Sequence, residues 1–202
     1  MQIIILPLGE TQTNCYILHN DSEAVIFDPG SDAPKIKQVL ADRGIKPLAI
    51  FLTHGHFDHI GAADELANFY KIPVYASELE KKLAKSLELN CSHFIGQVIT
   101  ANVTDIIQAG SKMNILGETL QILATPGHTS GSLSFYFENL GILISGDVIF
   151  KGGCGRYDLP TSNFEELKQS IKTIYALPSD TQILSGHGDT TTVADEREGG
   201  II

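Results

Sequence analysis

Hydrophobic residues along the chain fall into short runs that predict strands alternating with helices. Apolar and β-branched runs bounded by turn-forming residues predict strands at 3–8, 14–20, 24–28, 49–52, 73–76, 119–125, 132–137, 141–147 and 182–186. Apolar residues at helical spacing predict helices at 33–43, at about 60–70, at 77–88 and at 163–177. Residues 88–118 show no clear pattern.

The order of these elements predicts the fold class. Strands, helices, further strands, a helix and a last strand are typical of an α/β sandwich, with two sheets inside and helices outside. The 202 residues contain no strict repeat, no low-complexity segment and no linker. We therefore expect one domain over residues 1–202.

Charge and cysteine content limit the kinds of partner and the cellular compartment that we expect for the protein. The formal net charge is −10, and no run of lysine or arginine is longer than a pair, which argues against nucleic acid or an anionic membrane as the partner. The three cysteines (Cys15, Cys91 and Cys154) are widely spaced, which favours a reducing compartment. The first ten residues, MQIIILPLGE, have no positive n-region, and no apolar run reaches the ~20 residues of a membrane span. We expect a cytoplasmic protein with a small-molecule substrate, and its oligomeric state stays open.

Metal-ligating residues follow four of the predicted strands. The stretch LAIFLTHGHFDHIG at 48–61 places three histidines and an aspartate within six positions. The stretches ILATPGHTSG, GILISGD and QILSGHG each end an apolar run with one more such residue beside a glycine. The seven candidates are His54, His56, Asp58, His59, His128, Asp147 and His187. Loops at the ends of buried strands are where α/β proteins place their sites.

The spacing of these candidates indicates two ions rather than one. His54 and His56 are two apart in extended chain, so their imidazoles point to the same side. Asp58 and the adjacent His59 are then free to face a second ion, and five imidazoles with two carboxylates exceed the about four ligands of one zinc. The predicted sets are His54, His56 and His128 for one ion, Asp58, His59 and His187 for the other, and Asp147 as a bridge.

Two adjacent divalent ions favour hydrolysis. Metal ions lower the pKa of bound water to about 7, and a pair clamps the attacking and leaving atoms. Asp58 is placed to orient the nucleophile and later to return a proton, so it is the candidate catalytic residue. An isolated histidine after a strand is usually structural, but a cluster as dense as HxHxDH is costly to leave unpaired near a core. His19 and His93 match no pattern, and we interpret them as ordinary residues.

The motifs HGHFDH, PGHTSG, SGD and SGHG together resemble those of the metallo-β-lactamase superfamily, over nearly the whole chain. This resemblance implies an αββα sandwich of two mixed sheets flanked by helices, with all seven candidates as ligands. The β-lactamases themselves lack the bridging aspartate, and flavodiiron proteins have a glutamate where His56 stands. GDVIFKGGCGRYD and GHGDTTTVADERE resemble the short, single-domain bacterial members of the glyoxalase II-like branch. We expect no separate C-terminal helical domain for glutathione.

The resemblance implies hydrolysis of a thioester, either S-lactoylglutathione or a related 2-hydroxyacyl thioester, by a hydroxide that bridges the metals. The expected cofactors are two divalent ions, zinc first, although histidine and carboxylate ligands also accept iron or manganese. One alternative is a persulfide dioxygenase with a single iron on His54, His128 and Asp147. Another is a metal-binding module without catalysis. The complete ligand set beside an open glycine-rich loop favours the hydrolase.

Four further features of the sequence could be either functional or only structural. Arg156 and Tyr157 are candidate substrate contacts, because a guanidinium binds a carboxylate bidentately, but Arg156 could instead pair with Asp158 and brace the loop. Asp28 either orients a ligand histidine or only forms the Asp-Pro-Gly turn. Cys154 fits as a small loop filler. The charged helix at 78–88 is expected to present a solvated face rather than a partner site.

Overall fold

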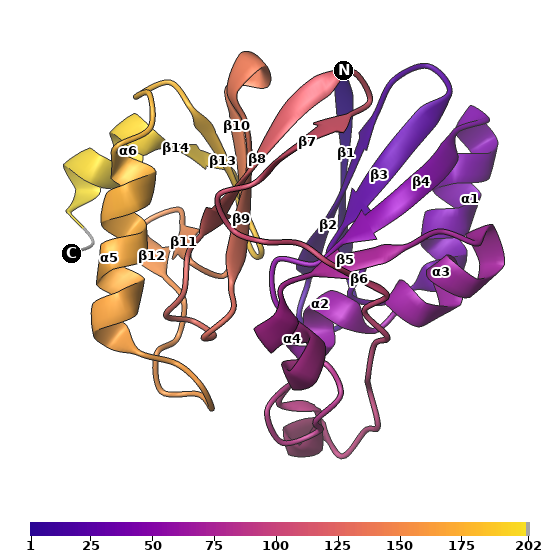
Figure 1. The fold of residues 1–202 in the computed structure, drawn as a ribbon, viewed down its shortest axis with the longest axis horizontal. Coiled ribbons are helices and arrows are strands. Elements are labelled where there is room, and N and C mark those ends of the chain that lie inside the picture. The colour runs from indigo at the N-terminus through magenta and orange to yellow at the C-terminus, as the bar shows by residue number, and fades with distance from the viewer. Residues whose placement is uncertain (201–202) are drawn as a thin grey trace.

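Two six-stranded sheets packed face to face form the centre of the protein (Figure 1). The computed structural model describes residues 1–200. The first sheet has the order β1 (Gln2–Leu8), β2 (Thr13–His19), β3 (Glu23–Phe27), β4 (Lys46–Phe51), β5 (Val74–Ala76) and β6 (Asp105–Ile106). The second has the order β14 (Thr191–Thr192), β13 (Gln182–Ser185), β10 (Ile142–Gly146), β9 (Leu133–Phe137), β8 (Glu118–Ala124) and β7 (Lys112–Ile115). A small hairpin, β11 (Ile149–Phe150) with β12 (Gly153–Cys154), stands apart from both.

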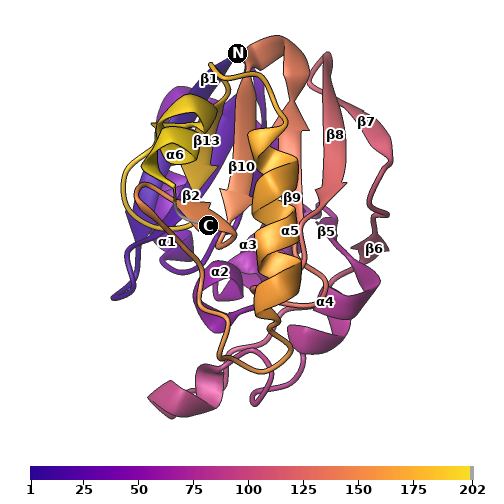
Figure 2. The ribbon, with the colours of Figure 1, turned by 90° about the vertical axis from the view of Figure 1, so that its left-hand side faces the viewer.

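Helices cover the outer face of each sheet (Figures 1 and 2). The first sheet carries α1 (Ala33–Arg43) and α3 (Ala63–Tyr70), and the second carries α5 (Phe164–Tyr175) and α6 (Val193–Gly199). The short elements α2 (Phe57–Ile60), α4 (Glu78–Leu83) and the 3-10 turn η1 (Ser92–Ile95) lie at one end of the sandwich, while η2 (Glu138–Leu140) follows β9. Both sheets mix parallel with antiparallel pairs, which confirms the expected αββα class.

Aromatic side chains fill the space between the two sheets. Phe27 of β3 packs against Phe51, Phe135 and Phe137, with ring centroids 5.3, 5.3 and 6.3 Å away. All four rings are buried. Since two of them come from each sheet, this cluster joins the halves of the chain.

Parallel pairing brings the ligand-bearing loops to one edge. β3, β4 and β5 run parallel in the first sheet, and β10 and β13 run parallel in the second. Parallel strands end at the same edge, and loops beyond that edge form sites. The sheets are also tied there directly, because the Leu133 N–H donates to the Thr53 carbonyl at 2.9 Å.

The predicted strands recur in the structure, whereas two helices and several short elements differ from the prediction. The helix predicted at about 60–70 is two helices, α2 and α3. The helix predicted at 77–88 ends at Leu83, because the following turns are fixed by Asn90, whose side-chain amide donates to the carbonyls of Ala84 and Ile99. The short elements that were not predicted are η1, β6, β7, η2, β11, β12, β14 and α6. Among the described residues, no helix is long and apolar enough to cross a membrane.

Phe27→Ala should test the importance of the inter-sheet cluster. Removing a ring that touches three others leaves a cavity, so we expect a loss of about 3–5 kcal/mol in the free energy of unfolding. Urea unfolding followed by circular dichroism measures it. Phe69→Ala is the control, because Phe69 is 63% exposed on α3; equal losses in the two variants would contradict this account of the core.

Candidate metal centre

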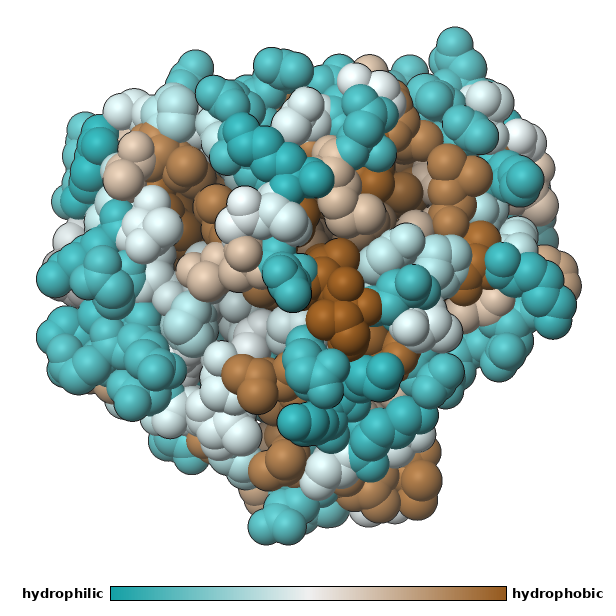
Figure 3. Space-filling model, in the orientation of Figure 1, coloured by the Kyte–Doolittle hydropathy of each residue, from teal (hydrophilic) through white to brown (hydrophobic). Residues whose placement is uncertain are grey.

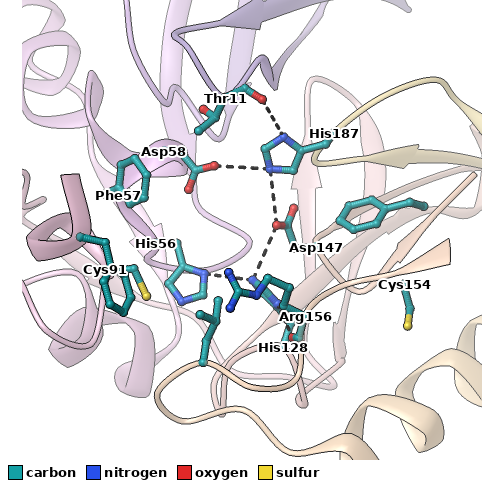
Figure 4. A pocket seen from close by; sticks show the side chains of 13 residues that line it. Thr11, His56, Phe57, Asp58, Cys91, His128, Asp147, Cys154, Arg156 and His187 are labelled. Atoms are coloured by element: carbon teal, nitrogen blue, oxygen red, sulfur yellow. Dashed lines mark hydrogen bonds and ion pairs between the residues drawn. The ribbon is translucent and has the colours of Figure 1, made fainter.

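The seven predicted ligands meet at the edge where the loops of both sheets converge. Figure 4 shows five of them: His56, Asp58, His128, Asp147 and His187. His54 and His56 follow β4, and Asp58 and His59 lie on α2. His128, Asp147 and His187 follow β8, β10 and β13. The first four come from the first half of the chain and the last three from the second half.

Their ligand atoms form groups whose members all lie within 4.8 Å of one another. One group is His54, His56 and His128, and a second is Asp58, His59 and His187. Asp147 lies between them: its Oδ1 is 3.3 Å from His59 Nε2, and its Oδ2 is 3.6 Å from His128 Nε2 and 3.5 Å from His187 Nε2. A third group, His54, His59 and Asp147, takes one histidine from each of the other two, so the division of the ligands between two ions stays a prediction.

Several polar atoms of this cluster are buried without a hydrogen-bond partner. Among the residues that the structure describes, these include Nε2 of His54 and of His59 and Oδ1 of Asp147. His56 Nδ1 and His128 Nε2 face each other at 2.9 Å. Buried polar atoms without partners are rare and costly. Nitrogen and oxygen lone pairs directed into one space are the donor set that zinc, iron and manganese accept, so the residues fit a metal centre.

The outer nitrogens of four of these imidazoles are held by neighbouring groups, which directs the inner nitrogens into the centre. The contacts are His54 Nδ1 with Thr53 Oγ1 (3.0 Å), His59 Nδ1 with Asp28 Oδ2 (3.0 Å), His128 Nδ1 with the Arg156 carbonyl (2.9 Å) and His187 Nδ1 with the Thr11 carbonyl (3.2 Å). Metal-ligating histidines are usually oriented in this way. Of the two interpretations of Asp28, its contact with His59 supports the orienting one.

Burial keeps three of the histidines neutral. It is the largest influence on the pKa of His54, which lies well below its ordinary value, and the positive charges of nearby histidines act in the same direction. Burial, followed by His128, lowers the pKa of His56 to about 3. The pKa of His128 is also lowered, again mainly by burial. A neutral imidazole has a free lone pair, so these three are ready to bind a cation.

The other ligands form charged pairs. Burial lowers the pKa of His187, but hydrogen bonds to Asp147 and Asp58 outweigh it and raise the pKa to about 9. Burial lowers the pKa of His59 as well, but the negative charges of Asp147 and Asp58 outweigh it and hold this pKa well above its ordinary value. Burial raises the pKa of Asp58, yet the charge of His59 and the contact with His187 outweigh it and lower the pKa to about 2. A divalent cation would replace the protons of these histidines.

Glycines beside the ligands leave room for the centre. A Cβ on Gly186 would overlap Asp147 Oδ1, and one on Gly155 would overlap the Asp147 carbonyl. The loops after β10, β12 and β13 therefore approach one another more closely than side chains would allow.

Glu80 of α4 is a residue that the sequence did not reveal. Its carboxylate is fully buried and accepts three hydrogen bonds, from the Gly55 N–H (2.7 Å), the Gly131 N–H (3.0 Å) and the Thr129 hydroxyl (2.7 Å). Burial raises the pKa of Glu80, and these hydrogen bonds act against that shift. Gly55 separates His54 from His56, and Thr129 follows His128. Glu80 thus fixes the loops of the first ligand group relative to each other, and the expected solvated face is wrong at this position.

The candidate substrate contacts lie in different places. Arg156 lines the cavity beside the cluster and makes a bidentate pair with Asp158, with Nε–Oδ1 and Nη2–Oδ2 both at 2.9 Å. Tyr157 is half exposed and packs on Phe164 with ring centroids 4.5 Å apart, and it is not among the lining residues. Cys154 lines the cavity.

An open cavity of about 610 Å³ gives access to the cluster. It is lined by ligands and by apolar side chains, among them Phe57, Phe94, Phe150 and Leu159. A second cavity of about 640 Å³ adjoins it and shares Thr11, Phe57 and Asp58. Together they are large enough for a small organic substrate.

Comparison with known proteins identifies the class. The family model of the metallo-beta-lactamase superfamily matches residues 8–187, and the chain belongs to this superfamily. The probable metallo-hydrolase YqgX of Bacillus subtilis is 44% identical over 196 residues, covering 96% of this chain and 93% of that protein. Hydroxyacylglutathione hydrolase GloC of Haemophilus influenzae is 35% identical, covering 98% and 95%.

Solved structures agree with the fold. The BLEG-1 B3 metallo-beta-lactamase has a TM-score of 0.94 at 40% identity, covering 98% of this chain and 97% of that one. TTHA1623 in a di-iron-bound form has a TM-score of 0.88 at 34% identity, covering 97% and 98%. The expected superfamily is thus confirmed, and the site is that of a metallo-hydrolase superfamily.

Glu80→Gln should reveal how strongly this carboxylate holds the two loops. The amide nitrogen of glutamine would face an N–H or hydroxyl donor, leaving buried donors unpaired, so we expect a loss of about 2–3 kcal/mol in the free energy of unfolding. Urea unfolding measures it. Glu78→Gln on the same helix is the matched control, because Glu78 is exposed and its contact with Lys82 is 4.0 Å long; we expect less than about 0.5 kcal/mol there. A negligible loss in Glu80→Gln would rule out this role.

Proposed function

We propose that this protein is a hydrolase with two divalent metal ions that cleaves thioesters of 2-hydroxyacids, either S-lactoylglutathione or a related thioester of another thiol. The observation that carries the proposal is the pair of adjoining ligand groups at the base of an open cavity. GloC, whose name is that of a hydroxyacylglutathione hydrolase, supports the thioester. The three free cysteines are compatible with the reducing, cytoplasmic setting that forms part of the proposal.

His54, His56 and His128 would hold one ion, and Asp58, His59 and His187 the other, with Asp147 in contact with both. Two bound ions supply a hydroxide nucleophile at neutral pH and stabilise negative charge on the carbonyl oxygen. Zinc suits these ligands, and iron, as in the di-iron form of TTHA1623, or manganese suits them as well.

Asp58 would act as the acid–base group of the reaction. The Thr13 hydroxyl donates to its Oδ2 at 3.0 Å, and His187 Nε2 lies 3.4 Å from the same oxygen. These contacts fix one carboxylate oxygen and keep the group ionised. Asp58 is thereby positioned to orient the nucleophile and to return the proton to the departing thiolate.

A β-lactam is the second candidate substrate, because BLEG-1, a B3 metallo-beta-lactamase, is 40% identical to this chain. A single-iron dioxygenase on His54, His128 and Asp147 is less well supported. The second group, Asp58, His59 and His187, also has three ligands, and in a single-iron enzyme this group would bind no ion.

Metal content tests the ligand assignment. Protein purified without chelator or affinity nickel should contain two ions per chain by elemental analysis. His54→Ala and His187→Ala should each retain about one ion, since each removes a ligand of a different group. The exposed His93 provides the control, and His93→Ala should keep both. One ion in the parent protein would argue against the binuclear site.

Activity tests the substrate class. The metal-loaded protein is mixed with lactoyl thioesters of several thiols and, separately, with a chromogenic β-lactam. We expect thioester hydrolysis that chelation abolishes and metal restores. Hydrolysis of the lactam alone would replace the thioester proposal by the second candidate.

Asp58→Asn should separate proton handling from substrate binding. Losing the acid–base group is expected to lower kcat by about 10²–10³ with a smaller change in KM. Elemental analysis of the same sample records the metal content. The remote, exposed Asp180 gives a matched control, Asp180→Asn. Unchanged kcat in Asp58→Asn would contradict the role assigned to this carboxylate.

A further inference from the structure

A loop with an apolar tip extends from the sandwich next to the metal centre. Residues 84–101 form this loop, which is closed at its base where the Ala101 N–H donates to the Ala84 carbonyl at 3.2 Å. Its tip exposes three large apolar side chains: Phe94 is 67% exposed, Ile95 44% and Val98 82%. In Figure 3 brown surface is visible on the lobe that projects from the lower edge of the molecule. We call these three residues the apolar tip.

The base of the loop is joined to the ligand-bearing segment. Asn90 is fully buried, and its carbonyl accepts from the Phe57 N–H at 2.9 Å, directly between His56 and Asp58 in sequence. Phe94 is also held in place, because its ring packs on His93 with centroids 3.9 Å apart and His93 Nδ1 lies 3.0 Å from the Leu87 carbonyl. The apolar tip therefore has a fixed position relative to the metal ligands.

Two of the three residues of the apolar tip, Phe94 and Ile95, line cavities next to the ligands. Phe94 lines the cavity that reaches the ligands, together with Phe57, Phe150 and Leu159. Ile95 lines the adjoining cavity, with Phe57 again on the shared wall. A substrate whose carbonyl reaches the ligands would thus have its remaining atoms beside these side chains.

Charge along this wall is sparse. Apart from the ligand cluster, Arg156 is the one charged side chain among the described residues that line the first cavity, and Asp158 already pairs with it. The adjoining cavity adds Lys35 but also Glu10 and Asp32. Glutathione carries two carboxylates and one ammonium group, and these residues offer its carboxylates little cationic complement.

We propose that Phe94 and Ile95 of the apolar tip, together with Phe57, Phe150 and Leu159, bind the group attached to the substrate's sulfur, and that this group is uncharged and apolar. The proposal rests on the proposed thioesterase function and specifies its thiol. Burying an apolar group against these side chains favours binding in proportion to the area removed from water.

A thioester panel with one acyl group tests this preference. The lactoyl thioesters of benzyl mercaptan, N-acetylcysteamine and glutathione are compared with the metal-loaded protein. We expect kcat/KM to be about tenfold higher for the benzyl than for the glutathione thioester, with N-acetylcysteamine between them. A higher value for glutathione overturns the proposal while leaving thioester hydrolysis intact.

The variant Phe94→Ser tests whether the apolar tip causes the preference for the benzyl thioester. It should lower kcat/KM for the benzyl thioester about tenfold and change that for N-acetylcysteamine less than about twofold. Phe69→Ser is matched in exposure (63%) but lies on α3, where Lys37 covers its ring, and it should change neither. Equal effects of the two variants would remove the apolar tip from substrate binding.

Binding of the non-hydrolysable benzyl and glutathione thioethers, followed by calorimetry, gives a readout that needs no turnover. One outcome is that the benzyl thioether binds the wild-type protein but not Phe94→Ser, while the wild-type protein hydrolyses no thioester. That outcome would support the apolar subsite and contradict the proposed reaction. Analytical sedimentation of the wild-type protein and of Phe94→Ser tests whether a second copy of the chain covers the apolar tip instead. A dimer of wild type that dissociates in Phe94→Ser would assign the apolar tip to a second copy of the chain and overturn the proposal.

Discussion

Asp28 directly follows β3, and its carboxylate has almost no contact with solvent; both of its oxygens accept hydrogen bonds. Oδ1 accepts from the Thr53 N–H at 2.8 Å, while Oδ2 accepts from the Thr53 hydroxyl at 2.7 Å and lies 3.0 Å from His59 Nδ1. Thr53 in turn contacts His54. The direction of two ligand histidines thus depends on one buried carboxylate. Because a buried carboxylate is costly unless fully paired, the surrounding loop has little freedom to move.

Glu80 has the corresponding role on the other side of the centre. Asp28 positions the first residues of the motif from the loop after β3, whereas Glu80 connects that motif to the loop of His128 in the second half of the chain. The geometry of the ligands is therefore set from behind by two buried acids that do not themselves face the cavity. Pre-organisation of this kind lets a site bind without rearranging its loops.

Much of this site could be predicted because its residues combine two independent signals. Each ligand follows an apolar strand, and most adjoin a glycine that the close approach of loops requires, as at Gly186. Glu80 lacked any such signal, because in sequence it belongs to a lysine- and glutamate-rich helix whose side chains normally face water. The end of that helix was equally hidden, since it depends on the contacts of Asn90 with Ala84 and Ile99, two segments apart along the chain. The elements β14 and α6 are too short for periodicity to indicate them.

Each ligand group draws on both halves of the chain: His54 and His56 combine with His128, and Asp58 and His59 combine with His187. Neither sheet alone contains a complete group, so an ion would join the two sheets as a cross-link. Such an ion binds only the assembled state and stabilises it by mass action. Metal uptake would then be the last step of biosynthesis, after residue 187 has left the ribosome and both sheets have docked. With ligands that accept several metals, the ion that the protein carries would record which metal was abundant in the cell at that moment.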